Sequence, residues 1–401
     1  MPEGHEVNSR PGRAAICLRM SAVKNNIIFM SSIEYQILLA AGHIDPDVDQ
    51  QAQLATLMAG DFNQDRLIRL ARKEGMTGLL YRSLKKTGIL GFLGHRQLQQ
   101  LQSFYYHTVQ HNLRVFSDLK QILQQSNEKG IQVVLLQGIA LLQKIYKDIG
   151  LRPLTDIDLW VLPEKRSVFG TLMTQLGYQS DSIYPNTFRK NQTIVDVNSH
   201  ILWADRIKSR KRLLSRSQHV IHDDIEICRF EGQSAGCLNV IDEVFYLSLH
   251  AFKHCVSRLV WLVDIKQSVT GWSTSNWKAL LDRATELGQV NIIYNMLYLM
   301  SYLFDLKSAD DIKIMTAEGG PNRLERMVLE KRLDGRPLPN WAPLLLFTAG
   351  KDLKTRAYFV FETLFPRPEI LRQVFANSAT LNVWHLYLKR VRQLVSQARL
   401  L

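Results

Sequence analysis

The spacing of apolar residues changes twice along the chain. From Ser31 to residue 130 the apolar residues recur at helical spacing, as in SIEYQILLAAG and in a long amphipathic stretch from about Arg96 to Asn127. Residues 131–232 alternate short apolar runs with helical segments, which is typical of strands joined by helices. Helical spacing returns over residues 233–401, as in NIIYNMLYLMSYLF. The pattern predicts an α+β fold, with a small mixed sheet flanked by N- and C-terminal helical regions.

The first 30 residues do not continue this pattern. They are polar and mixed, and their one apolar stretch, Ile27–Met30, is too brief for a signal peptide. Directly after Met30, the spacing Ser31-x-x-Glu34 matches a helix capping box. We therefore expect residues 1–30 to be a disordered or non-essential tail, and the folded chain to begin at Ser31.

Two carboxylates stand in the second apolar run of the central region. Asp156 and Asp158 occupy alternate positions of a predicted strand, so their side chains point the same way. The neighbouring residues Ile157 and Leu159 are apolar, and a buried strand seldom holds unpaired charges because their burial is very costly. Mg²⁺ prefers such oxygen ligands and commonly bridges them to substrate phosphates. The pattern indicates a metal–nucleotide site, and the alternative is a solvated strand end.

A third carboxylate follows in the segment TIVDVNSHIL, at Thr193–Leu202, which is predicted as another strand carrying Asp196. If this strand pairs beside the first, Asp196 reaches the same metals, and carboxylates from neighbouring strands can hold two cations. The alternative is a charge on an edge strand. Between the two strands, Pro163 is predicted to start a helix that runs to about Gln175 and ends near Gly177.

These residues resemble a known family. LLQGIALLQKIY…LRPLTDIDLWV is similar to the pattern LLKG-x-AL…Y…GLRP-x-x-DIDLLV of the uncharacterised nucleotidyltransferase family, a branch of the polymerase-β-like superfamily. The most specific part is Leu136–Val161, and the resemblance covers roughly residues 31–400. It continues in three further segments, which are DRLIRLARKEGMTGLLYRSL at Asp65–Leu84, VDVN at Val195–Asn198 and LNVIDEVFYLSLHAFKH…LVWLVDI at Leu238–Ile265.

The resemblance implies a metal- and NTP-dependent nucleotidyltransferase whose core is residues 131–232. Asp156, Asp158 and Asp196 would be its catalytic residues and would hold Mg²⁺ or Mn²⁺. Gly138 would let the backbone approach the phosphates, and amides of the following helix would face them. The acceptor would attack the α-phosphate and pyrophosphate would leave. The expected donor is ATP, and the acceptor is a small molecule, a peptide or a protein that the sequence does not identify.

Two positions depart from the family pattern. Gln137 stands where many members have lysine. If that lysine helps to neutralise the triphosphate, this protein must use Lys144, Arg152 or another cation. Asn198 stands where the family has histidine, and His200 follows two residues later. Asparagine can ligate or donate a hydrogen bond, but it cannot act as an acid or a base.

Further candidates for the acceptor pocket lie in the helical block that resembles the family. His250 and His254 share one helix face at a spacing that can bind zinc, although Ala251 replaces the glutamate of a zinc-protease motif. A packed or cleft-lining histidine pair is the favoured interpretation. Lys253 and Asp264 belong to the same block and are candidates for lining the acceptor pocket. With these two, the candidate acceptor-pocket residues are Asn198, His200, His250, Lys253, His254 and Asp264.

Composition agrees with a folded protein, since 46% of the 401 residues are hydrophobic. The four cysteines are Cys17, Cys228, Cys237 and Cys255, and none forms a Cys-x-x-Cys motif. We expect reduced thiols and a cytoplasmic protein. No run reaches the roughly 18 apolar residues needed to span a bilayer.

The net charge of +13 arises partly from two basic clusters, at residues 208–216 and 389–399. Basic clusters fit an anionic substrate or a nucleic acid, or they are solvated helix faces. Three functions stay open: a nucleotidyltransferase acting on a small molecule, peptide or protein; a catalytically degenerate nucleotide-binding or scaffold protein; and an RNA- or tRNA-directed nucleotidyltransferase. Nucleic acid is not the favoured partner, because charge alone carries little specificity.

Overall fold

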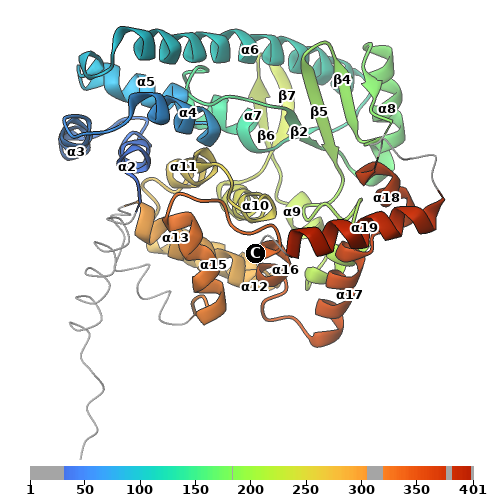
Figure 1. Cartoon of the computed structure of the whole chain (residues 1–401). Helices are drawn as coiled ribbons and strands as arrows, with labels where there is room; N and C mark the ends of the chain where they lie inside the picture. Colours follow the sequence, from blue (N-terminus) through green and yellow to red (C-terminus); the bar gives the residue numbers. More distant parts are fainter. Residues whose placement is uncertain (1–30, 183, 305–318, 376–381, 399–401) are drawn as a thin grey trace, which may run out of the picture.

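A seven-stranded mixed sheet lies among helices in the computed structural model, which describes residues 31–182, 184–304, 319–375 and 382–398 (Figure 1). The predicted α+β fold is confirmed. The predicted tail at residues 1–30 lies outside the described residues, and so does Cys17.

The helices before the sheet are α2 (Ile33–Ala40), α3 (Val48–Met58), α4 (Gln64–Glu74), α5 (Thr77–Lys86) and α6 (His95–Glu128). The predicted capping box at Ser31 and Glu34 was wrong. Ser32 caps α2 by accepting a hydrogen bond from the Tyr35 amide, because the helix begins one residue later than predicted. The Glu34 carboxylate instead accepts a hydrogen bond from the Asn63 amide, so it joins α2 to the start of α4.

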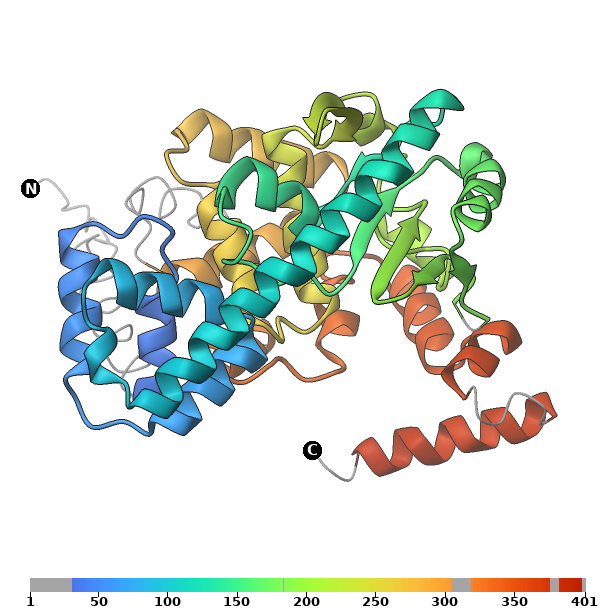
Figure 2. The ribbon, with the colours of Figure 1, turned by 90° about the horizontal axis from the view of Figure 1, so that it is seen from above.

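The long helix α6 matches the amphipathic stretch predicted from about Arg96 to Asn127. It extends from the N-terminal helices across one face of the sheet, as the view from above shows (Figure 2). Leu101, Val115, Leu119 and Ile122 are fully or almost fully buried, and they recur at the spacing of one helix face. One continuous helix thereby joins the N-terminal helices to the sheet.

The strands are β1 (Val134–Leu135), β2 (Ile157–Trp160), β3 (Gln179–Ser180), β4 (Thr187–Lys190), β5 (Thr193–Asn198), β6 (Glu226–Phe230) and β7 (Gln233–Cys237). Their order across the sheet is β3-β4-β5-β2-β1-β7-β6. The pairs β2–β5 and β1–β7 are parallel, and the other neighbouring pairs are antiparallel. The two strands predicted to carry the carboxylates are therefore neighbours in the centre of the sheet.

Short helices connect these strands. They are α7 (Gln137–Leu141), which continues as a π-helical turn to Tyr146, α8 (Arg166–Gln175) and α9 (His219–His222), with 3-10 turns at Pro163–Lys165 and Lys208–Leu213. The helix predicted between Pro163 and Gln175 is confirmed as a 3-10 turn that runs into α8. Gly177 follows it with a φ of +84°, a left-handed conformation that glycine adopts without strain.

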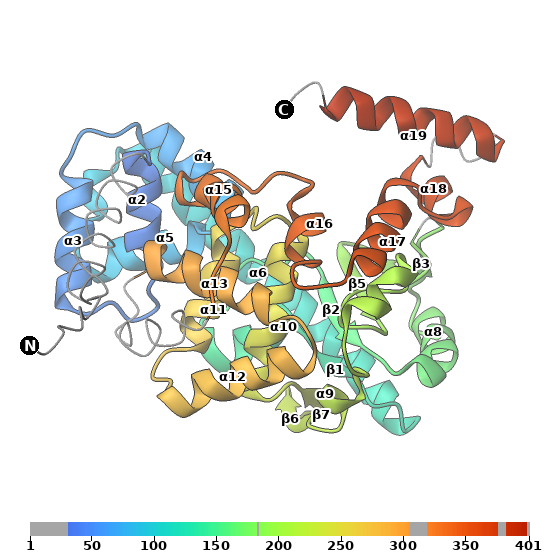
Figure 3. The same ribbon diagram turned by 90° about the horizontal axis from the view of Figure 1, so that it is seen from below.

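The helices after the sheet are α10 (Val240–Lys253), α11 (Leu259–Ser268), α12 (Thr274–Glu286), α13 (Val290–Leu303), α15 (Arg323–Leu333), α16 (Ala342–Leu346), α17 (Leu353–Leu364), α18 (Pro368–Val374) and α19 (Val383–Ala398). Of the described helices, none is long and apolar enough to cross a membrane. The apolar helix α13 is mostly buried. From below, α17, α18 and α19 lie on the side of the sheet that carries β3 and β5 (Figure 3).

The prediction that the cysteines are reduced thiols was wrong for Cys228 and Cys237, which form a disulfide with a Cα–Cα distance of 6.1 Å. The register of the β6–β7 hairpin accounts for the pairing. Cys228 lies opposite Ala235, so Cys237, two residues further along β7, is its diagonal neighbour on the same sheet face. Cys255 is a free, half-buried cysteine.

Lys266 of α11 is buried against the segment that directly follows α2. Its Nζ donates to the Gly42 carbonyl at 3.1 Å and lies 2.8 Å from ring nitrogens of His43. Among the described residues it has no ion-pair partner. Burial lowers the pKa of Lys266 to about 7. This lysine therefore makes the stability of the protein depend on pH.

We expect the free energy of unfolding to rise between pH 7 and pH 9. An unfolded lysine keeps its proton to about pH 10.4, so above pH 7 the unfolded chain binds more protons than the folded one. The part of this rise that Lys266 contributes has an upper limit of about 1.4 kcal/mol per pH unit. Urea unfolding at several pH values measures it. Lys266→Met should remove this contribution, and Lys85→Met, at an exposed lysine, should not. An unchanged slope in Lys266→Met would contradict the assignment.

Candidate functional site

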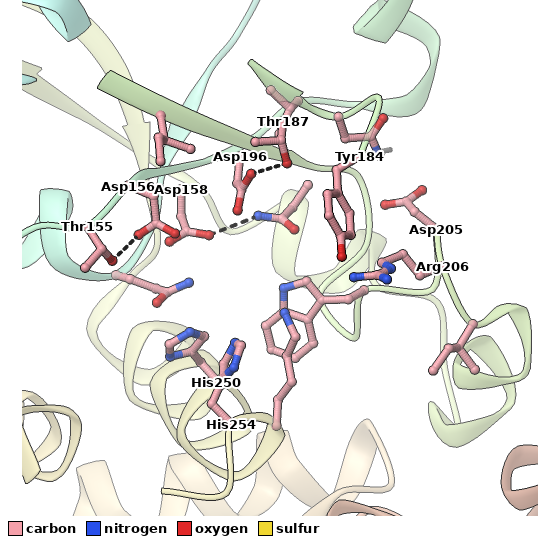
Figure 4. Close-up of a pocket in the computed structure, with 18 of the residues that line it drawn as sticks. Thr155, Asp156, Asp158, Tyr184, Thr187, Asp196, Asp205, Arg206, His250 and His254 are labelled. Atoms are coloured by element: carbon pink, nitrogen blue, oxygen red, sulfur yellow. Dashed lines mark hydrogen bonds between the residues drawn. The ribbon is translucent and has the colours of Figure 1, made fainter. Parts of the chain in front are cut away.

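A cavity of about 920 Å³, within the usual size range of small-molecule sites, opens beside the paired strands β2 and β5. Five parts of the chain line it, and Figure 4 shows many of the lining side chains. These parts are the start of α7, the β2–β5 region, the loop after β5, the turn between α10 and α11, and the C-terminal segment from Thr363 to Arg390.

Asp156, Asp158 and Asp196 lie together in one wall of this cavity (Figure 4). Parallel pairing of β2 with β5 sets Asp158 directly opposite Asp196. Asp156 comes just before β2 and therefore points to the same side as Asp158. The β2 residues between and after them, Ile157 and Leu159, are fully buried on the opposite face. The apolar side chains of β2 thus fix the strand in the core, and its other face carries the carboxylates into the cavity.

Each carboxylate accepts one hydrogen bond from a neighbouring polar side chain. Thr155 Oγ1 donates to Asp156 Oδ1 at 2.8 Å, and Asn198 Nδ2 donates to Asp158 Oδ1 at 3.4 Å. Thr187 Oγ1 of β4 donates to Asp196 Oδ1 at 2.5 Å. These bonds orient the carboxylates but bring no positive charge to them.

Negative charge at this wall is poorly compensated. Burial raises the pKa of Asp158 well above its ordinary value, and the charges of Asp156 and Asp196 raise it further. Burial likewise raises the pKa of Asp196, which the hydrogen bond from Thr187 partly opposes. Carboxylates with this behaviour are favourable places for a cation, because a cation relieves both the repulsion and the loss of hydration.

Lys253, at the end of α10, is a cation that acts on both Asp158 and Asp196, and Arg189 also acts on Asp196. Its Nζ lies 3.9 Å from the centre of the Trp203 ring. Burial lowers its pKa to about 7, the nearby Arg210 lowers it too, and the charges of Asp158 and Asp196 oppose the shift. The charge of Lys253 therefore interacts both with the carboxylates of this wall and with Arg206 and Arg210.

His250 and His254 line the cavity as a packed pair. Their ring centres are 4.7 Å apart, and the Trp261 ring lies 5.0 Å from His250 and 5.5 Å from His254. Burial lowers the pKa of both rings, to about 3 for His254, so both are neutral at pH 7. Neutral rings against an indole form an aromatic surface that suits a planar or apolar part of a substrate.

The turn after β1 contains a residue with a left-handed backbone conformation. Gln137, and not Gly138, has a left-handed φ of +56°. Gly138 is required for another reason, because a Cβ there would overlap the guanidinium of Arg152. Arg152 is in turn fixed by Asp264, to which its Nη2 donates at 2.9 Å. Tyr146 Oη also donates to Asp264, at 2.6 Å. This buried network positions the loop that enters β2.

Replacing Gly138 by alanine is expected to lower the free energy of unfolding by about 1–3 kcal/mol, as overpacking of a filled site does. The added methyl group must displace the guanidinium of Arg152, which Asp264 holds in place. Urea unfolding measures the loss. Gly91→Ala is the matched control, because its Cβ would meet nothing within 4 Å. Equal stability of the two variants would contradict the packing assigned to Gly138.

Three of the candidate residues lie away from the cavity. Lys144 donates to the Leu238 carbonyl at 3.1 Å and lies 3.7 Å from Glu243. His200 is buried, and its Nδ1 accepts a hydrogen bond from the Leu202 amide. Asp264 lies behind Arg152. The candidates that do line the cavity are Gln137, Gly138, Arg152, Asp156, Asp158, Asp196, Asn198, His250, Lys253 and His254.

Sequence reasoning missed several lining residues in the segments on either side of β4 and β5. Tyr184 and Trp203 contribute aromatic rings, and Arg206 and Arg210 contribute guanidinium groups. The loop after β5 is held by Asp205, which accepts a hydrogen bond from Ser199 Oγ at 2.6 Å and pairs with Arg166. The only available signal was the basic cluster at residues 208–216, which contains Arg210.

Among the described residues, no three His, Cys, Asp or Glu side chains form a ready-made metal-binding group. This arrangement is compatible with Mg²⁺, which usually takes one or two protein carboxylates and completes its shell with phosphate oxygens and water. The three aspartates supply such oxygen ligands and an excess of negative charge.

Comparison with known proteins gives one match. The model of a family described as uncharacterised nucleotidyltransferase matches residues 60–305 of the 401-residue chain, a range that includes the three aspartates and both cavity-lining histidines. No curated protein matches the chain, and no solved structure matches it.

Proposed function

Since the chain belongs to the uncharacterised nucleotidyltransferase family, we propose that it transfers an NMP group from an NTP to an acceptor bound in the cavity beside Asp156, Asp158 and Asp196. The family membership supports nucleotidyl transfer in general. The assignment of these three aspartates to the site is supported by the register of β2 and β5, in which Asp158 lies opposite Asp196 at a cavity wall.

In this proposal Asp156 and Asp158 bind the metal-bound triphosphate. Mg²⁺, or Mn²⁺ in its place, would neutralise phosphate charge and polarise the α-phosphate when it is bound. The uncompensated charge of the two carboxylates favours this binding, and the hydrogen bonds from Thr155 and Asn198 hold their orientation. Asn198 thus has a positioning role that does not require the histidine of the family pattern.

Asp196 would accept the proton of the attacking hydroxyl. A bond forms between the acceptor oxygen and the α-phosphorus, and the bond from that phosphorus to the bridging oxygen of pyrophosphate breaks. Burial raises the pKa of Asp196, which makes its carboxylate a stronger base than an exposed aspartate. Thr187 holds one oxygen of Asp196, which leaves the other free for the proton.

Positive charge for the reacting phosphates would come from Lys253. Arg152 lines the cavity, but Asp264 already neutralises it through a buried ion pair at 2.9 Å. Lys144 pairs with Glu243 away from the cavity. Lys253 instead lies near Asp158 and Asp196, and it is the cation best placed to replace the lysine missing at Gln137.

Transfer of label from two positions of the nucleotide tests the proposal. The full-length protein is incubated with Mg²⁺ and each NTP labelled at the α- or the γ-phosphate, together with a fractionated small-molecule extract. We expect α-label to enter an acceptor and γ-label to leave as pyrophosphate. Transfer of γ-label would show phosphoryl transfer and would contradict the proposal. If the label is found in RNA or in protein instead, the acceptor belongs to that class of molecule.

A further inference from the structure

The two halves of the cavity differ in chemistry. Thr155 and Asp156 lie together in one half, which receives the donor triphosphate in the proposed function (Figure 4). Tyr184 and Arg206 lie on the other side of Asp196 from Thr155 and Asp156 (Figure 4). Because the acceptor must approach the α-phosphate from the side opposite to the leaving pyrophosphate, this second half is where the acceptor binds.

Arg206 and Arg210 supply unpaired positive charge to the second half. Among the described residues, neither forms an ion pair with a carboxylate. The adjacent Asp205 is paired with Arg166, at 3.3 Å. Burial lowers the pKa of Arg210 to about 10, repulsion from Arg206 contributes, and the charge of Glu362 opposes the shift. Arg152 differs, because Asp264 neutralises its charge directly.

Both guanidinium groups are held in place without a carboxylate. Arg206 stacks on the Tyr184 ring, with its Cζ 4.7 Å from the ring centre. Arg210 Nη1 donates to the Leu202 carbonyl at 3.2 Å. An arginine that is oriented by an aromatic ring or a carbonyl keeps further N–H groups for a bound oxyanion. Apolar surface from Pro366 and Ile370 lines the same cavity.

We propose that Arg206 and Arg210 bind an oxyanion group of the acceptor, a phosphate or a carboxylate, so that the acceptor is an anionic small molecule. This inference rests on the proposed function, which assigns the donor phosphates to the half of the cavity near Asp156. The anionic group serves as a handle and does not react. The nucleophilic oxygen of the same acceptor bonds to the α-phosphorus, pyrophosphate leaves, and Asp196 takes the proton.

Binding of small anions tests this subsite without the true acceptor. The probes are phenyl phosphate, benzoate and the neutral benzyl alcohol, and calorimetry measures their dissociation constants on the full-length protein saturated with Mg²⁺ and a non-hydrolysable ATP analogue. We expect wild type to bind at least one anion and not the alcohol. The probe that binds identifies the anion as phosphate or carboxylate.

The variant Arg206→Gln/Arg210→Gln should weaken anion binding by at least about tenfold, since it removes both cationic hydrogen-bond donors of the subsite. Lys211→Gln/Arg212→Gln is the matched control. It removes the same charge from the same segment, at exposed residues that do not line the cavity. The control should bind the anion with wild-type affinity. The single variant Arg206→Gln, at an exposed residue, serves if the double variant does not fold.

Several results would overturn the assignment. They are a lack of anion binding by wild type, equal losses in the arginine variant and the control, and tighter arginine-dependent binding of a short single-stranded RNA. Loss of nucleotide affinity in the arginine variant alone would mean that these arginines hold the donor triphosphate. If wild type binds no nucleotide, the proposed function is wrong. Anion binding measured without nucleotide then still tests whether Arg206 and Arg210 bind an oxyanion.

Discussion

Replacing Asp156 and Asp158 together by asparagine is expected to abolish nucleotidyl transfer, with a loss of at least about 10³-fold, while the protein stays folded. Asparagine keeps the shape of the side chain but removes the charge that binds a metal-bound triphosphate. In the apo protein these charges repel each other and Asp196, as the raised pKa of Asp158 indicates. The variant should therefore be at least as stable as wild type without ligands.

Transfer of α-label and urea unfolding measure the two effects separately. Asp61→Asn/Asp223→Asn is the matched control, because it makes the same change of charge at two exposed positions outside the cavity. The control should keep wild-type activity. Transfer by the Asp156/Asp158 variant at more than a tenth of the wild-type rate would contradict the assignment of the site. A large loss of stability would indicate a structural role instead.

Replacing Arg332 by methionine is expected to lower the free energy of unfolding by about 3–5 kcal/mol, because it leaves a buried carboxylate unpaired. Arg332 of α15 and Glu74 of α4 are both fully buried, and Arg332 Nη2 lies 2.6 Å from Glu74 Oε2. Glu74 also accepts a hydrogen bond from the Leu259 amide at the start of α11. This one pair therefore joins the N-terminal helices to two helices that follow the sheet.

Urea unfolding of wild type, Arg332→Met, Glu74→Leu and the double variant measures how much this ion pair contributes to stability. The double variant Glu74→Leu/Arg332→Met should lose less stability than the sum of the single variants, since neither charge is then left alone. Arg336→Met is the control, because Arg336 pairs with Asp334 at the same 2.6 Å but is largely exposed. It should lie within about 0.5 kcal/mol of wild type. A similarly small change in Arg332→Met would contradict the role of the buried pair.

Local periodicity is sufficient to predict the parts of the fold that depend on one segment at a time. The alternation around Asp156 and Asp158 predicts the strand and the face on which both side chains lie, and β2 has that arrangement. The spacing from Arg96 to Asn127 likewise predicts α6. The neighbouring position of Asp196 follows only if its strand pairs with the first, and the parallel β2–β5 pairing meets that condition.

Features that depend on contacts between distant segments were not predictable in this way. The β6–β7 register that pairs Cys228 with Cys237 is one example. Asp264 is another, because its position behind Arg152 depends on how α11 packs against the loop before β2. The need for glycine at position 138 is a third example, because a Cβ there would overlap the side chain of Arg152, 14 residues later in the chain. Sequence patterns do not encode these distances directly.

The arginines of the cavity illustrate the same limit at the functional site. Arg210 belongs to the basic cluster at residues 208–216, which the sequence presents only as a patch of charge, and Arg206 lies just before that cluster. Their role depends on the loop after β5, which Asp205 holds through Ser199 and Arg166. The fold thereby places two of the chain's many basic residues, Arg206 and Arg210, in the wall of the cavity that also holds the three aspartates.

Thermal stability with each of the four NTPs, with and without Mg²⁺, tests the central claim most directly. It needs no acceptor, because a ligand at 100 times its Kd stabilises the folded state by about 2.7 kcal/mol. We expect a Mg²⁺-dependent rise in Tm with at least one NTP, kept in Asp61→Asn/Asp223→Asn and lost in Asp156→Asn/Asp158→Asn. No rise with any nucleotide, or an equal rise in the Asp156/Asp158 variant, would contradict a metal–nucleotide site at these aspartates.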